Sequence, residues 1–431
     1  MPFAALDLHK KVVQAIVVDD NGTVLYRDRF PATRAALLDF AQKRLSPDCA
    51  LTLEATTNTW AVVELLAPFV REVVPSNPLK TRAIAEAKVK TDRVDAEVLV
   101  HLLRTNFLPR VWCPDPQTRA LRHLTTERAN LVADCTRLKN RIHAVLHQRL
   151  IEPPEADLFS TASLRWLATL DLDPDGLETL HRHLRQLAHV ESELQLLTGK
   201  LAVHAHATPE VKLLMTLPGV DFAVAETILS TLGDWTRFPT ADKAAAYFGL
   251  VPSTHQSGTH CYHGSITKQG RGHARWMLVE AAQHLEDHPG PLGVFFRRLK
   301  KKKGHNVAVV AAAHKLVTIA WHMLNNNEPY RYAQPRTTEA KMSRLRVRAT
   351  GQRRKGGFPK GQGRPAAYGT GQSTRAVPSL DQIYAKEQLP ALAPQLPGEL
   401  KMLERFGLTE YAGQVRIAHR IPRKCEKAKP A

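Results

Sequence analysis

An aspartate stands inside the apolar segment that opens this chain, where a charged side chain is costly to bury. Asp7 lies between Leu6 and Leu8 in a run that is typical of a buried strand. Glu54 likewise ends the apolar run 50–54. Burial of an unpaired carboxylate costs several kcal/mol. These two acids therefore need a compensating partner, such as a bound cation.

A second pair of acids, Asp92 and Asp95, opens a helical pattern in the segment 90–96. Residues three apart share one face of a helix, so both carboxylates can point at one ion. Carboxylates that hold Mg²⁺ are the usual apparatus of phosphate-ester chemistry. Helix capping is an alternative for Asp92, but it does not explain Asp7. The four acids together indicate a metal-dependent nuclease of the RNase H-like, resolvase type.

Residues 1–112 alternate between strand and helix patterns. We expect strands at 2–8, 11–18, 23–30, 49–54 and 71–75, and helices at 32–45, 58–69, 78–87 and 93–104. Asp20-Asn21-Gly22 is a hairpin signal between the second and third strands. This order predicts an α/β domain with the acids at one end of its sheet.

Residues 113–203 follow heptads and predict a helical, coiled-coil middle. Apolar residues recur by fours and threes from Leu124 to Val145, with Arg128 as the polar interruption, and again from Leu180 to Leu201. An antiparallel hairpin, a coiled coil between subunits and a plain helical bundle all fit this pattern.

Residues 204–326 predict a mainly helical domain. Leu217-Pro218-Gly219-Val220 resembles the turn of a helix-hairpin-helix, whose glycine admits a phosphate. The segment 249–272 reads as a long functional loop. In it, Ser257 beside Gly258 is a candidate nucleophile, although Ser253 and Ser265 are equal by composition. Its three histidines and Cys261 invite a zinc site, but their spacing matches no familiar zinc pattern.

The chain carries a formal charge of +19, which points to a nucleic acid as partner. Residues 331–375 hold twelve Lys or Arg and one acid, and predict a disordered basic arm within a basic extension, 327–431. Lys268, Arg271 and Arg275 are candidates to hold the scissile phosphate. Further candidate contacts to nucleic acid are Arg297, Arg298, Lys300, Lys301, Lys302, Lys303, Arg353, Arg354 and Lys355.

Five scattered cysteines favour a reducing compartment without disulfides. We find no export leader and expect no membrane span. The expected location is therefore the cytoplasm of a prokaryote, at the nucleoid.

Taken jointly, these motifs resemble the DEDD transposases of insertion sequences of the 110/1111 type. The matching residues are Asp7 in Ala-Leu-Asp-Leu-His-Lys, Glu54 in Leu-Glu-Ala-Thr, Asp92 and Asp95 in 90–96, Leu217-Pro218-Gly219-Val220, Gly249-Leu250-Val251-Pro252, Ser257-Gly258, Gly264 to Gly270, Arg275 and the helix 308–324. Their order and spacing agree across residues 1–325. The basic region beyond lies outside the shared pattern.

The resemblance implies a RuvC-like domain that holds Mg²⁺ on Asp7, Glu54, Asp92 and Asp95. It also implies a C-terminal transposase domain in which Ser257 attacks DNA. A structured guide RNA, the bridge RNA, would select donor and target DNA, and protomers would assemble as dimers and a tetramer. Two other functions remain open from the residues themselves: a metal-dependent Holliday-junction nuclease, and a non-enzymatic RNA- or DNA-binding protein.

Overall fold

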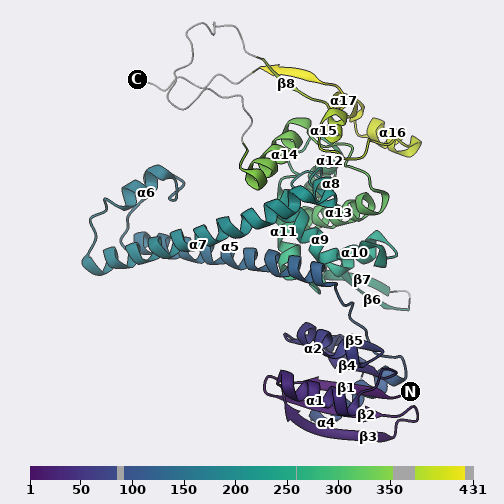
Figure 1. Ribbon diagram of the computed structural model, residues 1–431. Helices are drawn as coiled ribbons and strands as arrows, with labels where there is room; N and C mark the ends of the chain where they lie inside the picture. The colour runs from purple at the N-terminus through teal and green to yellow at the C-terminus, as the bar shows by residue number, and fades with distance from the viewer. Residues whose placement is uncertain (85–91, 259, 353–373, 423–431) are drawn as a thin grey trace. The chain divides into compact units, whose positions relative to one another are not determined.

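The computed structural model describes residues 1–84, 92–258, 260–352 and 374–422, which form two compact units (Figure 1). Unit 1 is Met1–Pro114 and unit 2 is Asp115–Ala431.

Unit 1 is a mixed five-stranded sheet with helices on both faces. Its elements are β1 (Phe3–Leu8), β2 (Val12–Val18), β3 (Val24–Pro31), α1 (Arg34–Arg44), β4 (Ala50–Glu54), α2 (Thr59–Leu66), η1 (Ala67–Phe69), β5 (Glu72–Ser76), α3 (Pro78–Ile84) and α4 (Asp92–Arg104). The strand order is β3-β2-β1-β4-β5. β1 to β3 pair antiparallel, whereas β4 runs parallel to both β1 and β5. The predicted elements of this region are confirmed where they are described, including the hairpin turn at Gly22 (φ +90°). The end of the predicted helix 78–87, beyond Ile84, lies outside the described residues.

Alternation along β1 divides its side chains between the two faces of the sheet. Ala4, Leu6 and Leu8 join the core under α1 and α2. Phe3 and Ala5 join the core under α4. Asp7 has the same parity as Phe3 and Ala5, so it belongs to the face that α4 covers.

Unit 2 is mainly helical. Its helices are α5 (Pro116–His147), α6 (Thr161–Leu167), α7 (Pro174–Ala207), α8 (Pro209–Leu214), α9 (Phe222–Leu232), η2 (Trp235–Arg237), α10 (Ala241–Tyr247), α11 (Gly272–Gln283), α12 (Pro291–Lys303), α13 (His305–Asn326), α14 (Pro335–Thr350), α15 (Leu380–Lys386), α16 (Pro397–Arg405) and α17 (Thr409–Gln414). Its strands are β6 (Pro252–Ser257), β7 (His260–Ile266), β8 (Thr374–Val377) and β9 (His419–Pro422).

The two heptad segments form one helical hairpin within the chain (Figure 1). Each long helix starts with an aspartate cap followed by proline: Asp115 before α5 and Asp173 before α7. Heptad residues such as Leu138 and Ile142 on α5 pack with Leu180 and Leu187 on α7. Of the arrangements that the heptads allowed, the antiparallel hairpin is therefore the one that forms within this chain.

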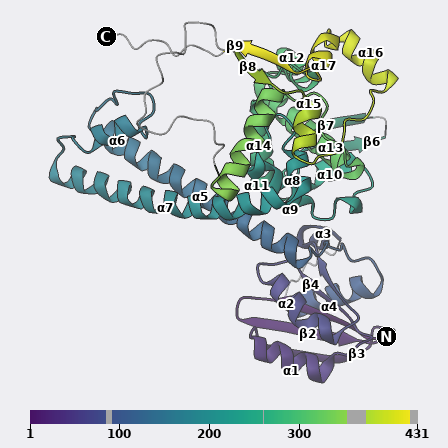
Figure 2. The same cartoon turned by 45° about the horizontal axis from the view of Figure 1, so that its top comes forward.

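The prediction of a disordered arm from residue 331 is wrong for residues 335–350. These residues form α14, which packs against α7 and α15 (Figure 2). Met342 and Leu345 on α14, and Leu380 and Tyr384 on α15, belong to the large core of unit 2. The basic residues of α14 masked its apolar stripe, because composition averages over both faces of a helix. Residues 353–373 lie outside the described part of the chain.

α13 also departs from the expectation of no membrane span. By length and composition alone, His305–Asn326 is apolar enough to cross a membrane. Its residues Ala312, Leu316 and Ala320 are fully buried in the core of unit 2. A helix buried in a protein core can have the same length and apolar composition.

Candidate active site

The sheet of unit 1 brings Asp7 and Glu54 to the same end of the same face. β1 and β4 are parallel neighbours with Leu6 opposite Leu53, so Asp7 and Glu54 follow in the next register position. Ala50 joins the core under α4, and Glu54 has the same parity along β4. Carboxyl ends of parallel strands meet at one edge of a sheet, and the two acids are therefore neighbours there.

α4 runs opposite in direction to β1, which carries its first turn toward these acids. Its last residue, Arg104, donates to the carbonyl of Asp20, just beyond the strand residue Val18 that pairs with Phe3 at the start of β1. The opposite end of α4, which begins at Asp92 and includes the half-buried Asp95, therefore lies toward Asp7. The buried stripe Ala96, Leu99, Val100 and Leu103 holds the helix on the sheet.

Asp7 is 9% exposed, and its Oδ2 lies 3.0 Å from Nε2 of His9. His9 was not among the predicted site residues. The alternation of β1 could have suggested it, since His9 stands two residues after Asp7.

The four predicted metal ligands are not all described at the level of side chains. The backbone of Asp92 begins α4, but its side chain lies outside the described residues. Among the side chains that are described, no group of three or more His, Cys, Asp or Glu is close enough to hold a metal ion. Asp7, Glu54 and Asp95 thus share one end of the sheet without forming a closed ligand set by themselves.

The segment around Ser257 is an exposed β-ribbon and not the predicted long loop. β6 and β7 pair antiparallel, with Ser257 opposite His260 at the tip. Gly258 has φ +57°, a conformation that glycine adopts without strain. Ser257 is exposed and ends β6. A loop was expected because the segment is polar on both faces, which removes the apolar alternation by which strands are recognised.

Two of the three predicted phosphate-binding residues beside the ribbon form hydrogen bonds within the protein. Arg271 is largely buried, and its guanidinium donates to the hydroxyl of Thr126 (2.7 Å) on α5. Burial lowers the pKa of Arg271. Arg275 donates to the carbonyl of Phe248 (3.2 Å). Lys268 is exposed, with φ +54°.

The basic residues at the end of α12 also fall into two groups, those bonded within the protein and those exposed to solvent. Arg297 donates to the carbonyls of Glu286 (2.7 Å) and His288 (2.9 Å), so it ties α12 to the segment that precedes it. Lys300 pairs with Glu286. Arg298, Lys301, Lys302 and Lys303 are exposed. Arg353, Arg354 and Lys355 lie outside the described residues.

The turn 217–220, for which a phosphate contact was predicted, packs closely against α11 and α14. Gly219 has φ +74°, and a Cβ on it would lie 2.2 Å from the carbonyl oxygen of Ala281 on α11. From α14, the buried Lys341 donates to the carbonyls of Met215, Leu217 (2.7 Å) and Val220 (2.9 Å). Burial lowers the pKa of Lys341 to about 7.

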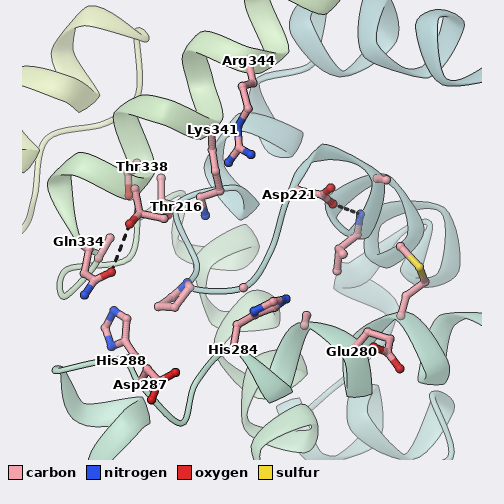
Figure 3. A pocket seen from close by; sticks show the side chains of 18 of the residues that line it. Thr216, Asp221, Glu280, His284, Asp287, His288, Gln334, Thr338, Lys341 and Arg344 are labelled. Carbon is pink, nitrogen blue, oxygen red and sulfur yellow. Dashed lines mark hydrogen bonds between the residues drawn. The ribbon is translucent and has the colours of Figure 1, made fainter. Parts of the chain in front are cut away.

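A cavity of about 470 Å³ opens beside this turn. Figure 3 shows Lys341 and Arg344 reaching into it from α14, with His284, Asp287 and His288 on another wall. The heptad interruption Arg128 also lines it, which explains why that α5 position is not apolar. The cavity walls carry both signs of charge.

Two family models match separate parts of this chain. Residues 4–151 match the DEDD-type IS110 transposase domain, described as a transposase, and residues 211–292 match the transposase domain of the IS116/IS110/IS902 family. The first match contains the acids of unit 1, and the second contains the β-ribbon with Ser257.

Curated relatives extend the likeness over most of the chain. A probable family 20 transposase of Pseudomonas aeruginosa is 26% identical over 345 residues, which is 76% of this chain and 97% of the relative. The transposase for insertion sequence element IS1328 of Yersinia enterocolitica is 24% identical over 324 residues, 73% of this chain and 94% of the relative. The transposase for IS1111A of Coxiella burnetii is 25% identical over 344 residues, 76% of this chain and 90% of the relative.

The mixed α/β unit, the helical unit and these matches define a DNA transposase, an enzyme of insertion sequences. The chain belongs to the IS110 family of transposases.

Proposed function

We propose that this transposase cuts and rejoins DNA through a transient ester between Ser257 and a DNA phosphate. Unit 1 would be a RuvC-like, RNase H-like domain in which Asp7, Glu54, Asp92 and Asp95 hold Mg²⁺. A structured guide RNA would direct the enzyme to donor and target DNA. The observation that carries the proposal is the convergence of Asp7, Glu54 and the start of α4 at one end of one sheet face.

The donor set fits a hard divalent cation. Carboxylate oxygens are the ligands that Mg²⁺ prefers, and Asp7 supplies a nearly buried carboxylate. Nε2 of His9 lies 3.0 Å from Oδ2 of Asp7 and is a hydrogen-bond partner for this carboxylate. A bound Mg²⁺ would neutralise charge on the phosphate under attack. Asp7 and Glu54, fixed on neighbouring strands, would set the position of that phosphate.

In the cleavage step the hydroxyl oxygen of Ser257 forms a bond to the scissile phosphorus. The bond from phosphorus to one deoxyribose oxygen breaks, and that oxygen leaves as a DNA hydroxyl. The serine loses one proton and the leaving oxygen gains one. One ester bond forms and one breaks, so the number of phosphate esters is unchanged. Re-joining is the reverse attack by a DNA hydroxyl. Exposure of Ser257 at a ribbon tip suits attack on a bulky duplex.

RNA guidance and subunit assembly rest on the resemblance to the family. The charge of +19 and the exposed basic residues Arg298, Lys301, Lys302 and Lys303 are compatible with a nucleic-acid backbone. Sequencing of RNA that copurifies with the full chain tests the guide. Recovery of random cellular RNA would contradict it.

The nucleophile is tested with Ser257→Ala and the matched variant Ser265→Ala, an exposed serine on the other strand of the ribbon. We expect Ser257→Ala to abolish recombination of the element's own DNA ends and the protein–DNA adduct that survives denaturant. Ser265→Ala should retain both. Cleavage without any adduct in the unsubstituted protein would show that water is the nucleophile, as in a metal-dependent junction nuclease.

A further inference from the structure

One face of the β-ribbon gathers ring side chains next to Ser257. Side chains two apart on a strand share a face, and directly paired residues of antiparallel strands point to the same side. His255 and Ser257 are two apart on β6, and they pair with Tyr262 and His260. All four residues therefore share one face of the ribbon.

His255 and Tyr262 form a flat stack on that face. Their ring centroids are 4.9 Å apart, and their planes are within 15° of parallel. Tyr262 is 64% exposed and His255 is also exposed. The stack is thus already ordered by the strand pairing, and much of the tyrosine ring remains open to solvent. A third flat ring can extend it without rearrangement of the protein.

The chain around the stack suits a polyanion. Between Gly249 and Arg275 the sequence contains no Asp or Glu. Of its three basic residues, Arg271 and Arg275 bond within the protein. Lys268 is exposed. A planar aromatic platform with basic neighbours and no acid is the usual way in which proteins bind single-stranded nucleic acid, because each base has a π-face.

We propose that Tyr262, backed by His255, stacks on an unpaired base of the DNA strand that Ser257 attacks. Two residues along a strand span about 7 Å, so the base lies within a few nucleotides of the scissile phosphate. The stack holds that strand open and in register with the serine. This assignment deepens the proposed function and rests on it for the identity of the strand. Tyr262 is a positioning residue, because it touches the substrate base and not the reacting phosphate.

The test measures binding and not catalysis, in full-length protein that carries Ser257→Ala. The probe is a short single-stranded DNA in which 5-iododeoxyuridine replaces thymidine, together with its duplex. Irradiation should cross-link the single strand to the peptide that contains Tyr262. Tyr262→Ala should weaken single-strand binding roughly 5- to 100-fold, the loss expected for one base stacked on an aromatic ring. Tyr262→Phe keeps the ring and should bind as tightly as the parent.

Two comparisons separate stacking from other causes. Trp276→Ala removes an exposed aromatic residue of α11 outside the ribbon and should leave binding unchanged. The salt dependence of binding should be the same with and without Tyr262, since stacking releases no counterions. Equal weakening of single-strand and duplex binding by Tyr262→Ala, or no weakening and no cross-link at Tyr262, would overturn the assignment.

An error in the assignment of Ser257 as the nucleophile would give a different experimental result from an error in the assignment of Tyr262. If Ser257 is not the nucleophile, recombination persists in Ser257→Ala, whereas the cross-link to Tyr262 does not depend on that outcome. Conversely, a covalent adduct at Ser257 with no contribution from Tyr262 would uphold the proposed function and remove the stacking platform.

Discussion

The ammonium nitrogen of Lys341 lies 2.7 Å from the carbonyl oxygen of Leu217, and it joins two parts of the chain 124 residues apart. It also donates to the carbonyls of Met215 and Val220. Three acceptors match the three N–H bonds of a charged lysine. α14, in the region beyond the motifs shared with the family, is thereby bonded to the turn at the centre of unit 2.

Lys341→Met should destabilise unit 2, because it leaves buried carbonyls without a donor. Each such loss costs roughly 1–3 kcal/mol, so the total is on the order of 3 kcal/mol or more. The midpoint of thermal unfolding should fall clearly. Arg344→Met, at an exposed position of the same helix, should change it little. Equal midpoints for the two variants would show that the buried bonds contribute nothing.

Gly219→Ala should also destabilise unit 2, and mainly through a steric clash. The added Cβ would lie 2.2 Å from the backbone oxygen of Ala281, so the turn or α11 must move. Overpacking and the positive φ together cost on the order of 3 kcal/mol. Gly351→Ala is the matched control, since Gly351 is left-handed, with φ +69°, but has no described atom within 4 Å of such a Cβ. It should cost roughly 1–2 kcal/mol, and a similar loss in both variants would contradict the clash.

Stability should fall as pH rises, through the pair formed by the buried Glu226 and the half-exposed His204. Oε1 of Glu226 lies 2.7 Å from Nδ1 of His204. Burial raises the pKa of Glu226 above its usual 4.5, and the hydrogen bond to Glu226 raises the pKa of His204 above 6.5. Both groups therefore hold protons more tightly when folded. Their stabilising effect is complete below the unfolded values and is lost as pH rises through the folded ones.

Glu226→Gln isolates this effect, since the amide does not titrate. The thermal midpoint of the parent, measured between about pH 5 and 9, should fall relative to that of the variant as pH rises. A difference that is independent of pH would mean that the pair does not exchange protons on unfolding.

Mg²⁺ should raise the thermal stability of the full chain if the acids of unit 1 bind it. A ligand present at a hundred times its dissociation constant stabilises by about 2.7 kcal/mol. Asp7→Asn should abolish the Mg²⁺-dependent shift. Asp39→Asn removes an exposed acid of α1 that pairs with Lys43, and it should keep the shift. A shift that survives Asp7→Asn would place the cation elsewhere.

Much of unit 1 could be predicted from sequence because its signals are local. Continuous apolar runs mark β1 and β4, Gly22 marks the hairpin, and the apolar stripe from Ala96 to Leu103 marks α4. The shared end of Asp7 and Glu54 then follows from parallel pairing. The ribbon around Ser257 escaped prediction, because a strand with two polar faces has no apolar alternation to reveal it.

Three basic residues, Arg271, Arg275 and Lys341, show what the sequence determines and what only the tertiary structure determines. The sequence determined that each is a basic residue in a basic chain, and the family motifs determined that the chain is a transposase. Only the tertiary structure decided that the two arginines bond to Thr126 and the Phe248 carbonyl, and that Lys341 is buried on three carbonyls. The physical reason is that a charge is a property of one residue. Its partner and its burial are set by segments up to 149 residues away, and no local pattern encodes them.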